Sequence, residues 1–90
     1  MHMHTSDAGL TRHARIRKQQ RAIPEAVIDY LLRFGESRPA GNGAESYFFN
    51  KRSWRQVETY LGATAAHFER YRNVYVIIAD GSVVTVAHRH

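Results

Sequence analysis

The stretch Val74-Tyr-Val-Ile-Ile-Ala-Asp-Gly-Ser-Val-Val-Thr-Val-Ala-His88 decides how this chain folds. Two runs rich in β-branched residues flank Asp80-Gly81, a dipeptide that readily takes the two positive-φ positions of a tight type I′ turn. The sequence therefore predicts a C-terminal β-hairpin.

A regular register across this turn makes both faces of the hairpin apolar. The pairs that it predicts are Ile78 with Val83, Val76 with Thr85, Val74 with Ala87, Tyr75 with Val86 and Ile77 with Val84. A strand pair that is apolar on both faces avoids water on both, so we expect the hairpin to lie centrally in its sheet or to be covered on both faces.

The length and composition of the chain limit the kind of protein that it can be. Ninety residues suffice for one domain, and the chain contains no cysteine, which fits a reducing cytosol better than secretion. The start Met1-His-Met-His-Thr-Ser6 lacks the apolar core of a signal peptide, and no apolar run approaches the ~20 residues that span a bilayer. We expect a soluble cytoplasmic protein with no membrane partner.

The net charge of +5 comes from one short segment. Residues 10–21 hold five Lys or Arg side chains and no acid, whereas the rest of the chain carries eight of each sign. The composition is helical, and a spacing of four places His13, Arg17 and Arg21 on one stripe. Such a helix favours RNA or another nucleic acid through its phosphates; a solvated surface and an acidic protein partner are the alternatives.

The remaining elements are predicted from periodicity and turn residues. Residues 1–9 are interpreted as a flexible tail and 10–90 as one domain. Between Pro24 and Gly35, apolar residues recur at helical spacing and predict the principal core helix. Basic and core helices followed by strands indicate an α+β fold, with N-terminal helices packed on a small, mostly antiparallel sheet.

The middle of the chain is less regular. Residues 36–46 contain a proline and a Gly-Asn-Gly run and are interpreted as a flexible loop, followed by a short strand over 47–49. Ser53 begins a helix with the spacing of a capping box, Gly62 ends it, and Thr64 caps a further short helix.

The end of the last strand combines imidazole and guanidinium groups. His88 and His90 point to one side of a strand and Arg89 to the other. A metal would need a third ligand from elsewhere, so no metal or other cofactor is predicted. Metal-free RNA cleavage needs a base, an acid and a cation beside the phosphate. The candidates for these roles are His13, Arg17, Lys51, Arg52, His88 and Arg89.

Five segments together resemble a known family. They are Thr11-Arg-His-Ala-Arg-Ile-Arg17, Arg21-Ala-Ile-Pro24, Phe34-Gly-Glu36, Tyr47-Phe-Phe49 and the final hairpin ending in His88-Arg89. This pattern resembles a family of small bacterial domains of unknown function, which is thought to be similar in fold to the RelE and BrnT ribonuclease toxins. Ala22 stands where the family usually has Gly.

The resemblance implies a RelE-like domain that engages RNA, with metal-independent endoribonuclease chemistry and an acidic antitoxin-like protein as partner. His13 and Arg17 match the basic helix of the family, and His88 and Arg89 match its strand end. The predicted catalytic residues are His13 and His88. The predicted RNA contacts are Arg12, Arg17, Arg21 and Arg89, with Lys51 and Arg52 added from charge alone. A non-catalytic nucleic-acid-binding module and a protein-interaction module are the alternatives.

Overall fold

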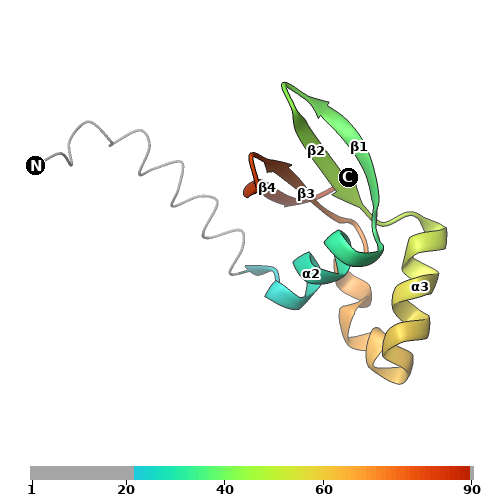
Figure 1. Cartoon of the computed structure of the whole chain (residues 1–90). Helices are drawn as coiled ribbons and strands as arrows, with labels where there is room; N and C mark the ends of the chain where they lie inside the picture. The colour runs from blue at the N-terminus through green and yellow to red at the C-terminus, as the bar shows by residue number, and fades with distance from the viewer. Residues whose placement is uncertain (1–21, 90) are drawn as a thin grey trace, which may run out of the picture.

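The computed structural model describes residues 22–89, which form a four-stranded antiparallel sheet with helices on one side (Figure 1). The elements in chain order are α2 (Glu25–Phe34), β1 (Glu36–Gly41), β2 (Ala44–Phe48), α3 (Lys51–Leu61), the 3-10 segment η2 (Gly62–Tyr71), β3 (Val74–Ala79) and β4 (Ser82–His88). The strand order is β1-β2-β3-β4. The α+β class and the antiparallel sheet are confirmed. The predicted tail and basic helix lie outside the described residues.

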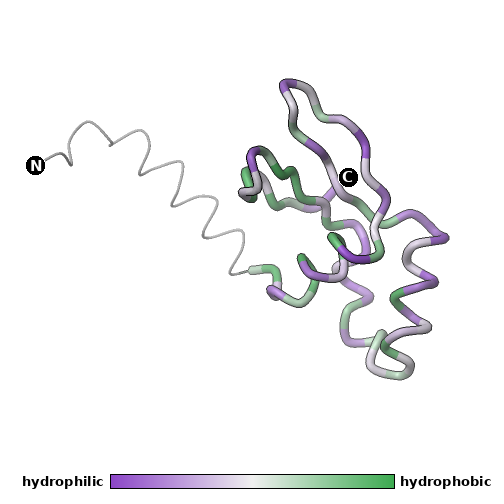
Figure 2. Tube along the Cα trace, in the orientation of Figure 1, coloured by the Kyte–Doolittle hydropathy of each residue, from purple (hydrophilic) through white to green (hydrophobic). Residues whose placement is uncertain are grey.

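The predicted C-terminal hairpin is β3 and β4. Asp80 and Gly81 have φ values of 53° and 75°, as a type I′ turn requires, and Ile78 lies opposite Val83 as predicted. These two strands also carry the most continuous apolar stretch of the described chain (Figure 2).

The rest of the predicted register is wrong by one residue. The register shifts between Ile77 and Ile78, so Val76, on the far side of the shift from the turn, lies opposite Val86 instead of Thr85. The shift is a β-bulge at Val84, which inserts one extra residue into β4. The regular register would have turned the Thr85 hydroxyl toward the core. The bulge turns Val86 there instead, where it is fully buried with Val76.

The predicted central position of the hairpin is wrong, whereas its predicted cover on both faces stays a prediction, because the basic helix lies outside the described residues. β4 is an edge strand, and the residues of β3 that are fully buried are the alternate ones, Val74 and Val76. Because alternate side chains of a strand point to opposite faces, the core that residues 22–89 form lies on one side of the sheet. Within residues 22–89 the other face has no helix against it.

The predicted loop over residues 36–46 is instead the hairpin of β1 and β2. Asn42 and Gly43, with φ values of 53° and 80°, form the same kind of turn as Asp80-Gly81. The sequence did not predict this hairpin because β1 is exposed along almost all of its length. It therefore lacks the alternation of apolar and polar residues that is typical of a strand. Backbone pairing with β2 holds this strand in place.

The core is formed where α2 and α3 meet the covered face of the sheet. The predicted core helix is confirmed, with Val27, Ile28 and Leu31 buried. From α3, Trp54 and Val57 complete the cluster. Among residues 22–89, this core leaves the opposite face of the sheet without a helix against it.

The start of α3 differs from the prediction by three residues. Asn50 is the N-cap: the Ser53 N–H donates to Asn50 Oδ1, and the Asn50 N–H donates to Ser53 Oγ, both at 2.8 Å. Ser53 is therefore the third residue of the helix, and Lys51 and Arg52 are its first two. The further helix predicted at Thr64 is part of η2, which follows α3 without a break.

Candidate nucleic-acid interface

The face of the sheet opposite α2 and α3 holds an open cavity of about 590 Å³. Tyr75 and Ile77 reach it from β3, since they alternate with the buried residues of that strand. The side chains that matter for its chemistry are Arg38, Ser46, Phe48, Tyr75, Ile77 and Arg89. We call the surface formed by these six residues the open sheet face.

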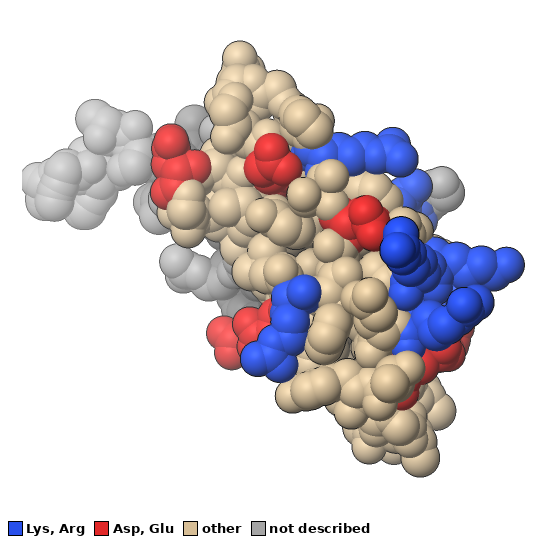
Figure 3. Space-filling view, turned by 45° about the vertical axis from the view of Figure 1, so that its right-hand side comes forward, with Lys and Arg blue, Asp and Glu red and all other residues tan. Residues whose placement is uncertain are grey.

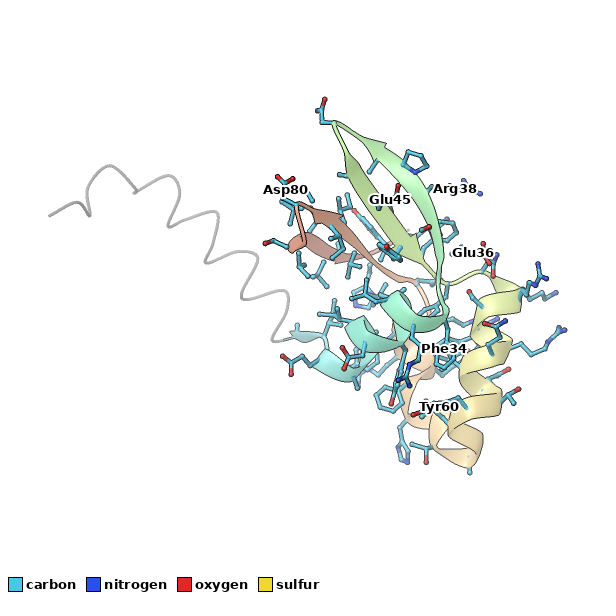
Figure 4. All side chains as sticks on the ribbon, in the orientation of Figure 1. Phe34, Glu36, Arg38, Glu45, Tyr60 and Asp80 are labelled. Carbon is cyan, nitrogen blue, oxygen red and sulfur yellow. The ribbon has the colours of Figure 1, made fainter. Side chains whose placement is uncertain are left out.

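Two guanidinium groups flank one aromatic ring on the open sheet face. The Cζ atoms of Arg38 and Arg89 both lie 5.1 Å from the centroid of the Phe48 ring. Arg38 extends from β1 (Figure 4), whereas Arg89 follows the end of β4. The backbone N–H of Arg89 donates to the carbonyl of Asn73 at 2.6 Å, which continues the β3–β4 pairing and fixes where this side chain begins.

Neither guanidinium is neutralised by a described carboxylate. Within residues 22–89 the one ion pair is Arg72 with Glu69, at 3.0 Å in η2 and its C-cap. Glu36 lies opposite Phe48 in the sheet but does not line the cavity. Two positive charges beside an apolar, aromatic floor are suited to an anionic ligand that also has flat apolar surface.

Two of the predicted site residues border the cavity, but their side chains point to opposite faces of the sheet. His88 and Arg89 both line the cavity. The His88 ring stacks on Tyr71, with centroids 6.5 Å apart and an interplanar angle of 28°, whereas Arg89 reaches Phe48. His88 lies opposite the buried Val74 and its ring lies against Tyr71, so its side chain points to the helix-covered side of the sheet although the residue borders the cavity.

The other predicted residues are not joined to this pair. Lys51 and Arg52 are exposed in the first turn of α3, and neither lines the cavity. Their RNA contact stays a prediction. The same holds for the predicted RNA contacts Arg12, Arg17 and Arg21 and for the predicted catalytic residue His13, which lie outside the described residues. Basic side chains nevertheless gather along one side of the molecule (Figure 3).

The sequence reasoning missed Arg38, Phe48 and Tyr75 as site residues. Arg38 fell in a segment interpreted as a loop, and Phe48 and Tyr75 were predicted as strand residues without a role in binding. The available signal was the Asn-Gly turn, which would have predicted β1 and placed an arginine on a strand beside Phe48.

A second surface lies between α2 and α3. The Phe34 and Tyr60 rings meet there at 5.4 Å between centroids, and a cavity of about 480 Å³ extends from them to Arg52 and Arg55 (Figure 4). Tyr60 is 57% exposed, and its hydroxyl accepts a hydrogen bond from Arg33 Nη1 at 3.3 Å. This groove is a candidate for contact with another protein.

Two further findings concern residues 22–89 alone. No group of three His, Cys, Asp or Glu side chains in this range is arranged to hold a metal ion. None of the helices in the same range combines the length and apolar character needed to cross a membrane.

Comparison with family models, with curated proteins and with solved structures finds no match to this chain. The family resemblance drawn from the sequence therefore stays a prediction. What the molecule can do follows from the chemistry of the open sheet face.

Proposed function

We propose that this protein binds RNA through the open sheet face. The observation that carries the proposal is the pair of arginines at 5.1 Å from the Phe48 ring, without a described carboxylate partner. In this proposal Arg38 and Arg89 contact phosphate groups, and the aromatic floor contacts bases. Sheet faces that combine aromatic rings with guanidinium groups suit RNA, since bases stack on both.

The distribution of charge supports the same ligand. Residues 10–21 supply five further positive charges, which strengthen any attraction to a polyanion. Lys51 and Arg52 lie in the first turn of α3, where the helix dipole disfavours cations and where no acidic residue is present. An anion bound nearby would relieve this repulsion. The RelE-like fold, the toxin role and an acidic antitoxin-like partner rest on the resemblance and remain parts of the proposal. The cytoplasmic location, which rests on the lack of cysteine and of a signal-peptide core, is also part of it.

The test is a salt titration of RNA binding by the full chain and by Arg89→Ala. Loss of one charged contact weakens binding by about 10-fold or more and lowers the slope of log affinity against log salt by about 0.7. Binding to labelled single-stranded RNA, followed by fluorescence anisotropy, measures both.

Arg70→Ala is the matched control for this variant. Its guanidinium also lies over an aromatic ring, 5.4 Å from the Tyr71 centroid, but it does not line the cavity. Equal losses in the two variants would mean that net charge, and not the open sheet face, governs binding. Arg17→Ala in the same assay measures the contribution of the basic segment.

A second candidate function is metal-independent RNA cleavage. The observation that favours it is that His88 borders the cavity that Arg38 and Arg89 line, with its ring against Tyr71 at the edge of the sheet. An imidazole can take or give a proton near neutral pH, and a guanidinium can stabilise charge on the phosphate. In this reaction the ribose 2′-oxygen loses its proton and attacks the adjacent phosphorus, while the bond from phosphorus to the 5′-oxygen of the next nucleotide breaks and that oxygen takes a proton. The products would carry a 2′,3′-cyclic phosphate and a 5′-hydroxyl.

For this candidate we expect EDTA-resistant cleavage of end-labelled RNA. His88→Ala should lower the cleavage rate by about 10²- to 10⁴-fold and leave RNA binding intact. His67→Ala, an exposed histidine of η2, should cleave at the normal rate. Intact RNA after incubation with the unaltered protein would rule out cleavage of free RNA while leaving the binding proposal standing.

A further inference from the structure

We infer that the open sheet face takes unpaired nucleotides, with the ring of Tyr75 as the surface on which one base stacks. The inference rests on the proposed function and specifies its ligand as single-stranded RNA.

Tyr75 occupies the middle of the sheet. Its strand lies between β2 and β4, where Tyr75 pairs with Phe48 on one side and with Ala87 on the other. The alanine is small, so the neighbouring strand places no large side chain beside the tyrosine ring on that side.

The rings of Phe48 and Tyr75 differ in the side chains that lie against them. Phe48 has two guanidinium groups at 5.1 Å. Within residues 22–89, no aromatic ring or guanidinium stacks on Tyr75. Tyr75 is thus the aromatic group of the open sheet face that a base can reach first.

The two arginines place the bound phosphates beside Tyr75. Arg38 extends from β1 and Arg89 from the end of β4, and both guanidinium groups lie 5.1 Å from the Phe48 ring. Phosphates that contact both arginines are therefore held around Phe48. Tyr75 lies opposite Phe48 in the sheet, so a base next to these phosphates can reach its ring.

Only unpaired bases can stack on the aromatic rings of the open sheet face. In a duplex each base is stacked between its neighbours, and a protein reaches base edges, sugars and phosphates but not base faces. Duplex RNA can contact Arg38 and Arg89 but gains nothing from Tyr75. An acidic protein segment likewise can neutralise the arginines, yet it offers no flat base for the ring.

The test compares one labelled RNA of twelve nucleotides, free and annealed to its complement, with the full-length protein. The unaltered protein should bind the single strand more tightly than the duplex. Tyr75→Leu keeps an apolar side chain but removes the ring, and should weaken single-strand binding between about 5-fold and about 150-fold. Because no charge is lost, the salt dependence should not change, and duplex binding should stay the same.

Two variants accompany this change. Tyr75→Phe keeps the ring and should keep the affinity for the single strand. Tyr60→Leu removes an exposed tyrosine that does not line the cavity and should have no effect. The fluorescence of Trp54, the one tryptophan of the chain and 2% exposed, reports whether each variant is folded.

The outcomes separate this inference from the proposed function. If the duplex binds as tightly as the single strand, or if Tyr75→Leu binds the single strand normally while Arg89→Ala does not, the stacking inference fails and RNA binding stands. If no RNA binds, both fail. Equally tight binding of a polyglutamate peptide with Tyr75→Leu unimpaired would overturn the inference in favour of an acidic protein ligand.

Discussion

Replacing both Arg38 and Arg89 by glutamate should lower the affinity for single-stranded RNA by on the order of 100-fold or more. Each arginine supplies a charge-assisted contact, and contacts of this kind contribute roughly 1.5–3 kcal/mol each. The glutamates also repel the phosphates that the arginines would attract. The loss should be largest at low salt, since the favourable and the repulsive terms are both screened as salt rises.

The double variant Arg33→Glu/Arg70→Glu is its control. It changes the net charge by the same amount, and both arginines lie over aromatic rings on the helical side: Arg33 over Phe34 and Tyr60, and Arg70 over Tyr71. We expect it to lose much less affinity. A similar loss in the two double variants would show that binding depends on overall charge, and the open sheet face would lose its special role.

The second large effect concerns the core. Leu31→Ala should lower the free energy of unfolding by about 2–5 kcal/mol, because Leu31 is fully buried and its loss leaves a cavity between α2 and the sheet. The whole stability of a domain this small is of order 5–15 kcal/mol, so the variant should unfold at clearly lower temperature or denaturant concentration. Trp54 fluorescence during urea denaturation measures the change.

Leu32→Ala is the same substitution one position further along the helix. Leu32 is 45% exposed, so its replacement should cost less than about 1 kcal/mol. If both variants were equally stable, α2 would not be anchored by Leu31, and the packing that leaves the opposite sheet face uncovered would be incorrect.

The sequence predicted the elements that carry a strong local signal. Asp80-Gly81 between two β-branched runs specifies a hairpin, and the apolar spacing of α2 specifies a core helix. Both depend on short-range chemistry that a single sequence contains. The class of the fold followed from these two elements and from the short strand before α3.

What the sequence did not predict depends on contacts between distant residues. The bulge at Val84 exists because Val86, and not Thr85, fits against the core, and the local pattern permits either register. β1 has no apolar alternation, so only its pairing with β2 identifies it as a strand. The meeting of Arg38 and Arg89 at Phe48 requires this pairing, because the two arginines are far apart in the chain and join through the sheet.

The measurement that tests the central claim most directly is a titration of isotope-labelled full-length protein with single-stranded RNA, followed by NMR amide shifts. The account predicts that the largest changes within residues 22–89 fall on Phe48, Tyr75, Ile77 and Arg89, with Leu32 and Tyr60 unchanged. Changes confined to the groove between α2 and α3, or no changes in residues 22–89, would contradict it.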